Sequence, residues 1–149
     1  MIAARLHKYH EALAVEQIAE PEITGPHDVI VRIGGAGLCR TDLHVQEGQW
    51  AEKSGVELPY VLGHENAGWV HEIGSAVTNV GVGDTVILHP LVTCGLCRAC
   101  RAGDDVHCTD NRFPGISADG GFAQLLKTTA RSVVKLEPTL HPKDIAALA

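Results

Sequence analysis

Aromatic residues, basic residues and long apolar runs are all scarce in this chain. It contains only two tryptophans, two tyrosines and two phenylalanines, none of them interleaved with a run of basic residues. Its 12 lysines and arginines stand against 18 acidic residues, which gives a formal net charge of −6. Nucleic acids and anionic membranes bind to cationic faces, so this composition argues against both as partners. No apolar run approaches the roughly 18 residues that span a bilayer.

The N-terminal residues do not show the pattern expected of an export signal. Met1 to Lys8 show no charged segment followed by an apolar run. We therefore expect a cytoplasmic, reducing environment, in which cysteines stay free or bind metal. A chain of 149 residues with 45% hydrophobic content can bury one substantial core and has room for hardly more than one domain.

Four of the five cysteines lie in one short segment. They are separated by two, two and seven residues and are Cys94, Cys97, Cys100 and Cys108. This spacing lets four thiolates reach one point, which is typical of a structural zinc site. The metal would supply the folding energy of a lobe, about residues 90–112, that is too short to bury its own core. Arg98 and Arg101 can offset the charge of minus two that four thiolates leave around Zn²⁺. Two disulfides, or reduced cysteines packed as small apolar residues, are the alternatives.

The remaining pattern predicts short strands. Sixteen glycines and seven prolines favour turns over long helices. Apolar or alternating segments predict strands within residues 2–6, 13–18, 29–33, 67–73, 80–88, 120–126 and 132–136. Glycines 34, 35 and 37 are expected to turn the chain sharply after the third of these. No helix of crossover length separates the strands, so the sheet should be mainly antiparallel and form a closed or nearly closed barrel.

Two short helices are also expected. The first covers residues 41–46 and has Thr41 or Asp42 as its N-cap. The second begins at Pro142, a residue suited to a first helical turn, and runs to Ala149. Because it stops after about two turns, we expect the chain to continue beyond Ala149 in the whole protein.

A second group of metal-binding side chains flanks two of the predicted core segments. Cys39 follows the strand at 29–33, and His64 follows the apolar segment at 59–62, so the two side chains could converge on one metal. Each signal is weak alone, because a lone buried cysteine is more often a packing residue. Asp42, His44 and Glu65 are neighbouring groups that such a site would need. A catalytic zinc takes three protein ligands and an open position, so Cys39 and His64 would supply two of the three.

Four motifs follow one another in a specific order. They are G-x-C-R-T-D-x-H at residues 37–44, G-H-E-x-x-G at 63–68, G-D-x-V at 83–86 and the four-cysteine lobe. With this combination the chain resembles the medium-chain, zinc-dependent alcohol dehydrogenase family along its whole length. The resemblance implies a mainly β, GroES-like β-barrel catalytic domain over residues 1–149, with short helices and a structural-zinc lobe. It implies reversible oxidation of a small-molecule alcohol to an aldehyde or ketone, with hydride transfer to NAD or NADP.

The resemblance also implies one catalytic and one structural zinc. Cys39 and His64 would hold the catalytic ion, with Glu65 beside it, and the four cysteines of the lobe would hold the structural one. Asp42 would fix the ring of His64, as metal-bound imidazoles generally require.

Further roles follow from the same resemblance. The hydroxyl of Thr41 would take the alcohol proton, and His44 would pass it to solvent by way of the cofactor ribose. Arg40 matches a position that faces the cofactor pyrophosphate, where a guanidinium can pair with phosphate oxygens. Three residues fall near positions that line the substrate pocket of the family, although a core role is an equal alternative: Trp50, Leu91 and Phe113.

Two departures from the family pattern limit what the chain can do alone. The third zinc ligand of the family would lie beyond Ala149, and no G-x-G-x-x-G fingerprint of a dinucleotide-binding Rossmann domain is present. We expect this domain to follow residue 149 in a longer enzyme and to mediate assembly into a homo-oligomer. The chain as given is expected to be inactive.

Two other functions compete with this interpretation. One is a non-enzymatic zinc-binding module whose cysteine lobe presents a recognition surface, which the acidic balance and scarce aromatics oppose. The other is a zinc-free reductase on the same barrel. Relatives of that kind lack the cysteine lobe, so its presence here counts against them.

Overall fold

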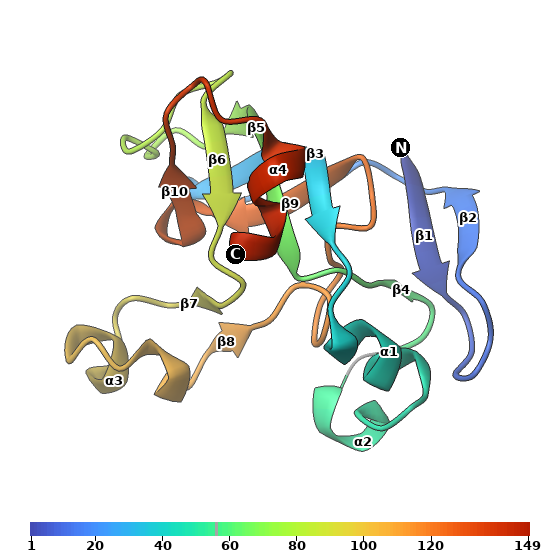
Figure 1. The fold of residues 1–149 in the computed structure, drawn as a ribbon. Helices are drawn as coiled ribbons and strands as arrows, with labels where there is room; N and C mark the ends of the chain where they lie inside the picture. The colour runs from blue at the N-terminus through green and yellow to red at the C-terminus, as the bar shows by residue number, and fades with distance from the viewer. Residues whose placement is uncertain (56) are drawn as a thin grey trace.

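The computed structural model describes residues 1–55 and 57–149 (Figure 1). Its strands are β1 (Ile2–Leu6), β2 (Ala14–Gln17), β3 (Asp28–Gly37), β4 (Tyr60–Val61), β5 (Glu65–Ile73), β6 (Thr85–Leu88), β7 (Val92–Thr93), β8 (Asn111–Arg112), β9 (Leu125–Thr129) and β10 (Val133–Lys135). Its helices are α1 (Arg40–Gln46), α2 (Ala51–Ser54), α3 (Arg98–Arg101) and α4 (Pro142–Ile145), with 3₁₀ turns η1 (Asp105–His107), η2 (Ala130–Ser132) and η3 (Ala146–Leu148). None of the helices in this described part of the chain has the length and apolarity needed to cross a membrane.

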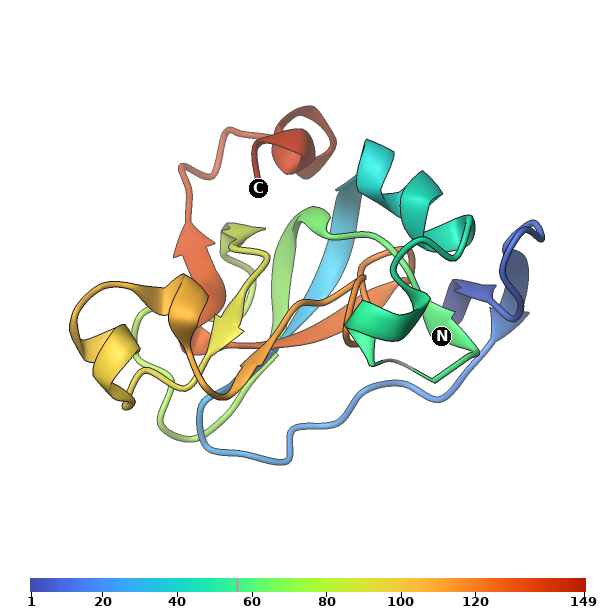
Figure 2. The ribbon, with the colours of Figure 1, turned by 90° about the horizontal axis from the view of Figure 1, so that it is seen from below.

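A five-stranded sheet forms the centre of the fold. Its order is β10-β6-β5-β3-β9, and every neighbouring pair is antiparallel. The sheet curls into a half-barrel with β9 and β10 as its two edges (Figure 2). The concave face buries one cluster of branched aliphatic side chains: Val29, Val31, Val70, Val77, Val80, Val86, Leu88, Leu126 and Val133. The predicted antiparallel, mainly β architecture is therefore confirmed, although the strands of the main sheet do not close into a complete ring.

A smaller sheet, β2-β1-β4, packs beside the first helix. Leu6 from β1 is fully buried against Val45 of α1 and against Tyr60 and Leu62. The tip of the β1–β2 hairpin is joined to α1 by a hydrogen bond from His10 N to Gln46 O, 2.7 Å long. This contact holds α1, and with it the segment after β3, in one position relative to the barrel.

Three local expectations are wrong. Glycines 34, 35 and 37 do not turn the chain, because β3 continues through Gly37 with a bulge between Ile33 and Gly35. The N-cap of α1 is Cys39, so Thr41 and Asp42 lie inside the first turn, where the Asp42 carboxylate accepts a bond from the capping backbone. The strand expected at 120–126 begins only at Leu125, because the backbone at 120–122 bonds to residues 61–63 and does not yet belong to β9.

The cysteine-rich lobe projects from the barrel beside β6 and β10 (Figure 1). It begins and ends on the two-stranded pair of β7 with β8 and contains α3 and η1 between them. The C-terminal helix α4 lies across one face of the sheet, over β3 and β5. Gly35 permits this approach, since a Cβ there would lie 2.7 Å from the Lys143 backbone. The helix expected from Pro142 is confirmed at its start, and its last turn tightens into η3.

Candidate metal centres

The pairing of β3 with β5 brings the first group of ligands together. Gly37 at the end of β3 lies opposite Glu65 at the start of β5, so the segments that carry Cys39 and His64 leave the sheet side by side. One ligand atom from each of Cys39, His64 and Glu65 lies within 4.8 Å of the other two. The thiol, imidazole and carboxylate are donors that zinc accepts, so this cluster fits a zinc ion.

A buried carboxylate joins the two ligand segments. Asp42 is 2% exposed, and its oxygens accept hydrogen bonds from Cys39 N at 2.9 Å and from Gly63 N at 3.2 Å. It also faces His64 Nδ1 at 3.4 Å, which leaves that nitrogen without a hydrogen bond of good geometry. The Asp42 carboxylate raises the pKa of His64 to about 8, although burial opposes the charged ring. Because Asp42 faces Nδ1, Nε2 is the nitrogen left to bind a metal.

Thr41 and His44 lie on α1, the helix that Cys39 caps. Thr41 Oγ1 is 3.7 Å from Cys39 Sγ. Hydrogen bonds from the Thr41 backbone and then from its hydroxyl lower the pKa of the Cys39 thiol, which favours the thiolate that a metal needs. His44 follows three residues after Thr41 on the helix, and its buried Nδ1 has no hydrogen-bond partner among the described residues. Arg40, the first residue of α1, is exposed.

The segment before His64 is held by contacts that the sequence did not reveal. Gly63 has a φ of +94°, and its carbonyl accepts bonds from Asn66 Nδ2 at 3.1 Å and from Gly121 N at 2.8 Å. Asn66 is 1% exposed, and a Cβ at Gly121 would overlap its side-chain amide. Asn66 and Gly121 therefore fix the backbone that carries His64. The asparagine directly after the G-H-E triplet was the available signal.

The three residues expected to line the substrate pocket lie in different surroundings. The ring of Phe113 lies edge-on to His64 with centroids 5.8 Å apart, so this side chain borders the cluster. Trp50, at the start of α2, is 38% exposed and makes no contact with the cluster among those described. Leu91 is half-buried beside the lobe, where its carbonyl accepts a bond from Ser132 Oγ.

The second centre is the lobe, where all four cysteines meet as free thiols. Sulfur separations are 3.5 Å for Cys97 and Cys100, 3.6 Å for Cys94 and Cys108, and 4.0 Å for Cys94 and Cys100. Tetrahedral zinc with Zn–S bonds of about 2.3 Å places its sulfurs about 3.8 Å apart. The lobe therefore has the dimensions of a four-thiolate zinc site.

The thiols of the lobe differ in how readily they ionise. The backbone N–H of Cys100 lowers the pKa of Cys97 to about 6, whereas burial raises the pKa of Cys100 to about 12. Four thiolates this close repel one another, and a divalent cation is what allows all of them to ionise. Arg98 and Arg101, which we expected to offset their charge, are both exposed and form no ion pair among the described residues. Arg131, from outside the lobe, is the arginine bonded into it.

Comparison with known proteins identifies the family to which the chain belongs. Residues 25–138 match the model of the alcohol dehydrogenase GroES-like domain, so the chain belongs to that family. D-arabinose 1-dehydrogenase (NADP(+)) of Saccharolobus solfataricus is 43% identical over 99% of this chain and 41% of its own. An alcohol dehydrogenase of Geobacillus stearothermophilus is 36% identical over 99% of this chain and 43% of its own.

Solved structures show the same relationship. The alcohol dehydrogenase of Aeropyrum pernix superposes with a TM-score of 0.92 at 48% identity and covers 99% of this chain and 42% of that one. Galactitol-1-phosphate dehydrogenase of Escherichia coli superposes with a TM-score of 0.88 at 30% identity and covers 98% and 41%. The GroES-like fold is thus confirmed, and the chain spans about two fifths of the length of the relatives it matches.

Proposed function

We propose that this chain is the catalytic domain of a zinc-dependent alcohol dehydrogenase, which oxidises an alcohol reversibly to an aldehyde or ketone with NAD or NADP. The observation that carries the proposal is the cluster of Cys39, His64 and Glu65 within 4.8 Å, with the hydroxyl of Thr41 beside it. A purely structural metal site has no need of the Thr41 hydroxyl beside it, or of the His44 imidazole whose Nδ1 makes no hydrogen bond among the described residues.

The cluster would hold the catalytic zinc through Cys39 and His64, with Glu65 or a residue outside this chain as the third ligand. When bound, zinc acts as a Lewis acid that lowers the pKa of an alcohol. Asp42 holds the segments of Cys39 and His64 side by side, because its carboxylate accepts hydrogen bonds from the backbone of both. The lobe would hold a second, structural zinc through its four cysteines.

Thr41 and His44 would move the alcohol proton. Thr41 Oγ1 lies close enough to Cys39 Sγ, at 3.7 Å, to contact an alcohol oxygen at the cluster. His44 is half-buried, and its Nδ1 lies 3.8 Å from Glu47 Oε2 and makes no hydrogen bond among the described residues; its ring can take the proton onward to the cofactor ribose and solvent. General acid–base contacts of this kind contribute on the order of 10² to 10⁴ in rate.

The cofactor would lie against α1. Arg40 is exposed at the start of this helix, where its guanidinium can pair with the pyrophosphate of NAD or NADP. The relatives are more than twice as long as this chain. In the whole protein, a Rossmann domain outside these 149 residues would bind the dinucleotide and mediate homo-oligomer assembly. We propose a cytoplasmic enzyme, with Phe113 lining the substrate pocket together with Trp50 and Leu91.

The test uses the whole protein that contains this chain. Formation of reduced NAD or NADP is followed with simple alcohols, L-threonine and D-arabinose, the last two chosen from the names of relatives. We expect Thr41→Ala to slow turnover by on the order of 10² or more, Thr41→Ser to retain most of it, and His44→Ala to be partly rescued by small bases. His107→Ala, an exposed histidine of the lobe, is the matched control. Equal turnover of Thr41→Ala and Thr41→Ser would contradict the proton relay.

The rival function is a zinc-binding module without catalysis. It predicts that Cys39→Ser leaves the zinc content at one ion per chain, whereas our proposal predicts two ions that fall to one. Elemental analysis of the metal-loaded whole protein distinguishes the two.

A further inference from the structure

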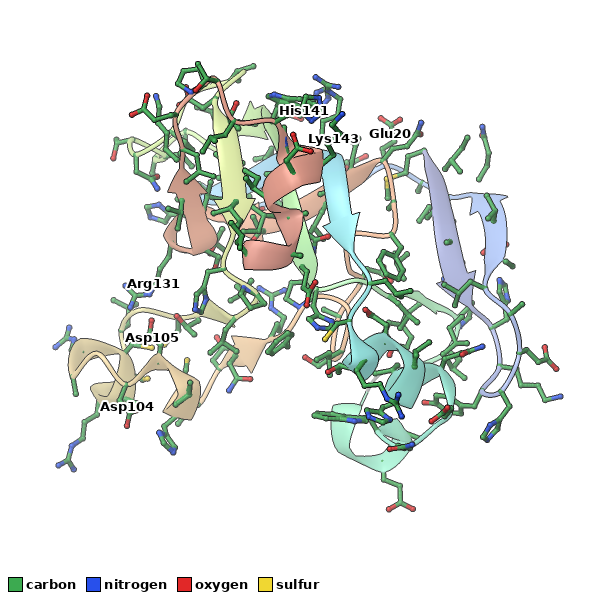
Figure 3. All side chains as sticks on the ribbon, viewed as in Figure 1. Glu20, Asp104, Asp105, Arg131, His141 and Lys143 are labelled. Atoms are coloured by element: carbon green, nitrogen blue, oxygen red, sulfur yellow. The ribbon has the colours of Figure 1, made fainter. Side chains whose placement is uncertain are left out.

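Arg131 joins the cysteine lobe to the barrel from outside the lobe. It belongs to η2, between β9 and β10, and Figure 3 shows it next to Asp105 of the lobe. Its NH2 donates to both carboxylate oxygens of Asp105, at 3.0 and 2.8 Å. Its Nε donates to Thr93 Oγ1 at 3.1 Å. One planar guanidinium thus bridges two segments of the lobe that lie twelve residues apart in sequence.

The groups that Arg131 holds are neighbours of the metal ligands. Thr93 directly precedes Cys94, and it is 8% exposed. The side chain of Arg131 also lies across Gly95, since a Cβ at that glycine would be 3.4 Å from Arg131 Cδ and 3.6 Å from its Nε. Arg131 therefore contacts the residues on both sides of Cys94. Asp105 lies on the segment between the third and fourth ligands, Cys100 and Cys108.

Charge gives this arrangement a second role. Four thiolates around one zinc carry a net charge of minus two, and the Asp105 carboxylate adds another negative charge beside them. Hydrogen bonding to Asp105, and then attraction to Cys100 and Cys94, raises the pKa of Arg131. As an ion pair alone the contact contributes little to folding, because the two side chains are 46% and 32% exposed. Its effect should therefore appear in metal binding.

We propose that Arg131 is a positioning residue for the metal site of the lobe. It holds the turn around Cys94 and the segment of Asp105 in the arrangement that directs the ligands at one ion, and it offsets the negative charge of the loaded site. This inference rests on the proposed four-cysteine zinc site. The sequence analysis expected Arg98 and Arg101, within the lobe, to offset the thiolate charge. The inference gives this function to Arg131, which lies outside the lobe in sequence.

The test measures zinc and cobalt affinity of the reduced chain by competition with a chromogenic chelator. Partners that orient metal ligands typically change affinity by about 10- to 100-fold, and the partial exposure of this pair favours the lower end. We expect Arg131→Gln to weaken binding about tenfold. Arg131→Lys should remain weakened, because one ammonium cannot hold Thr93 and both oxygens of Asp105 together. Arg98→Gln and Arg101→Gln remove the same charge from the same lobe and should change affinity less than about twofold.

Two further measurements separate positioning from misfolding. Circular dichroism of each loaded variant checks that the barrel is intact, and the cobalt–thiolate absorption reports the geometry of the four sulfurs. We expect Arg131→Gln to change this spectrum and the two control variants to leave it unchanged. Asp105→Asn, which keeps the shape of the side chain, should reproduce part of the loss.

Several outcomes would overturn the inference. If Arg131→Gln binds as tightly as the unaltered chain, Arg131 does not position the site. If Arg98→Gln or Arg101→Gln weakens binding equally, the effect is one of general charge. Failure of the unaltered chain to bind cobalt through its thiolates would instead refute the zinc site itself.

Discussion

Replacement of Gly121 by alanine tests whether the backbone before His64 is as tightly held as the structure indicates. Gly121 N donates to Gly63 O at 2.8 Å, and Asn66 Nδ2 donates to the same oxygen at 3.1 Å. The φ of Gly121 is not in the left-handed region, so alanine can adopt its backbone conformation. A Cβ would nevertheless overlap the amide of Asn66, whose side chain is almost completely buried. The substitution therefore acts through packing.

The expected cost has two parts. Forcing an extra methyl group into a packed interior costs about 1 to 3 kcal/mol. Displacing Asn66 breaks its bond to Gly63 O and leaves a buried amide unsatisfied, which costs about 1 to 3 kcal/mol more. Asn66 Oδ1 already lacks a partner among the described residues, so its amide has no obvious alternative contact. We expect a loss of about 2 to 6 kcal/mol in the free energy of unfolding.

Urea unfolding of the zinc-loaded chain, followed by tryptophan fluorescence, measures this loss as a lower midpoint with an unchanged slope. Gly81→Ala is the matched control. A Cβ there meets only Asp84 Oδ2 at 3.9 Å, so we expect a change within about 0.5 kcal/mol, or a small gain. If the clash is with Asn66, Gly121→Ala should cost at least about 1 kcal/mol less in an Asn66→Ala background. A midpoint for Gly121→Ala equal to that of the unaltered chain would refute the packing argument.

Three other perturbations have clear expected outcomes. Zinc should raise the urea midpoint of the chain and Cys97→Ser should remove most of that rise, which unfolding with and without a chelator measures. Burial opposes ionisation of Asp28, but hydrogen bonds from the backbone of Thr24 and Gly25 lower its pKa. The ionised carboxylate therefore stabilises the fold at neutral pH, and this stabilisation is lost below about pH 4. Asp28→Asn should accordingly flatten the acid dependence of the urea midpoint. Leu6→Ala should cost about 2 to 5 kcal/mol by the same assay, because Leu6 is 0% exposed, and Val15→Ala, at 75% exposed, should cost almost nothing.

The lobe was the part of the molecule most accessible from sequence. Its four ligands lie within residues 94–108, and local spacing alone predicts that they meet, as they do. The meeting of Cys39 with His64 depends on the pairing of β3 with β5, and the sequence pattern contains no register. The positions of Cys39 and His64 after two core segments made their meeting possible, and the ordered motifs of the family made it specific.

The failures of the sequence analysis have physical causes as well. Glycines 34, 35 and 37 were interpreted as turn residues because glycine tolerates unusual dihedral angles, but in β3 they permit close approach of other parts of the chain. Cys39 was not considered as an N-cap, because serine, threonine, aspartate and asparagine are the usual capping residues. The sequence analysis did not consider Arg131, because this residue lies outside the lobe in sequence and contacts it only in the folded chain.

The bulge in β3 shows why close approach matters for the metal cluster. Ile33 pairs with Gly68, but Gly35 pairs with Ala67, so Gly34 is an extra residue on its strand. If Gly34 instead paired with Ala67 and continued the register of Ile33 with Gly68, Gly37 would lie opposite His64 and not opposite Glu65. A shift of one residue turns side chains to the other face of a sheet. Gly34 is held against the ring of Trp69 and against Pro142 of α4, with a Cβ there only 2.9 Å from Pro142 Cβ. The packing of the C-terminal helix on β3 is therefore part of what directs Cys39 and His64 to one point.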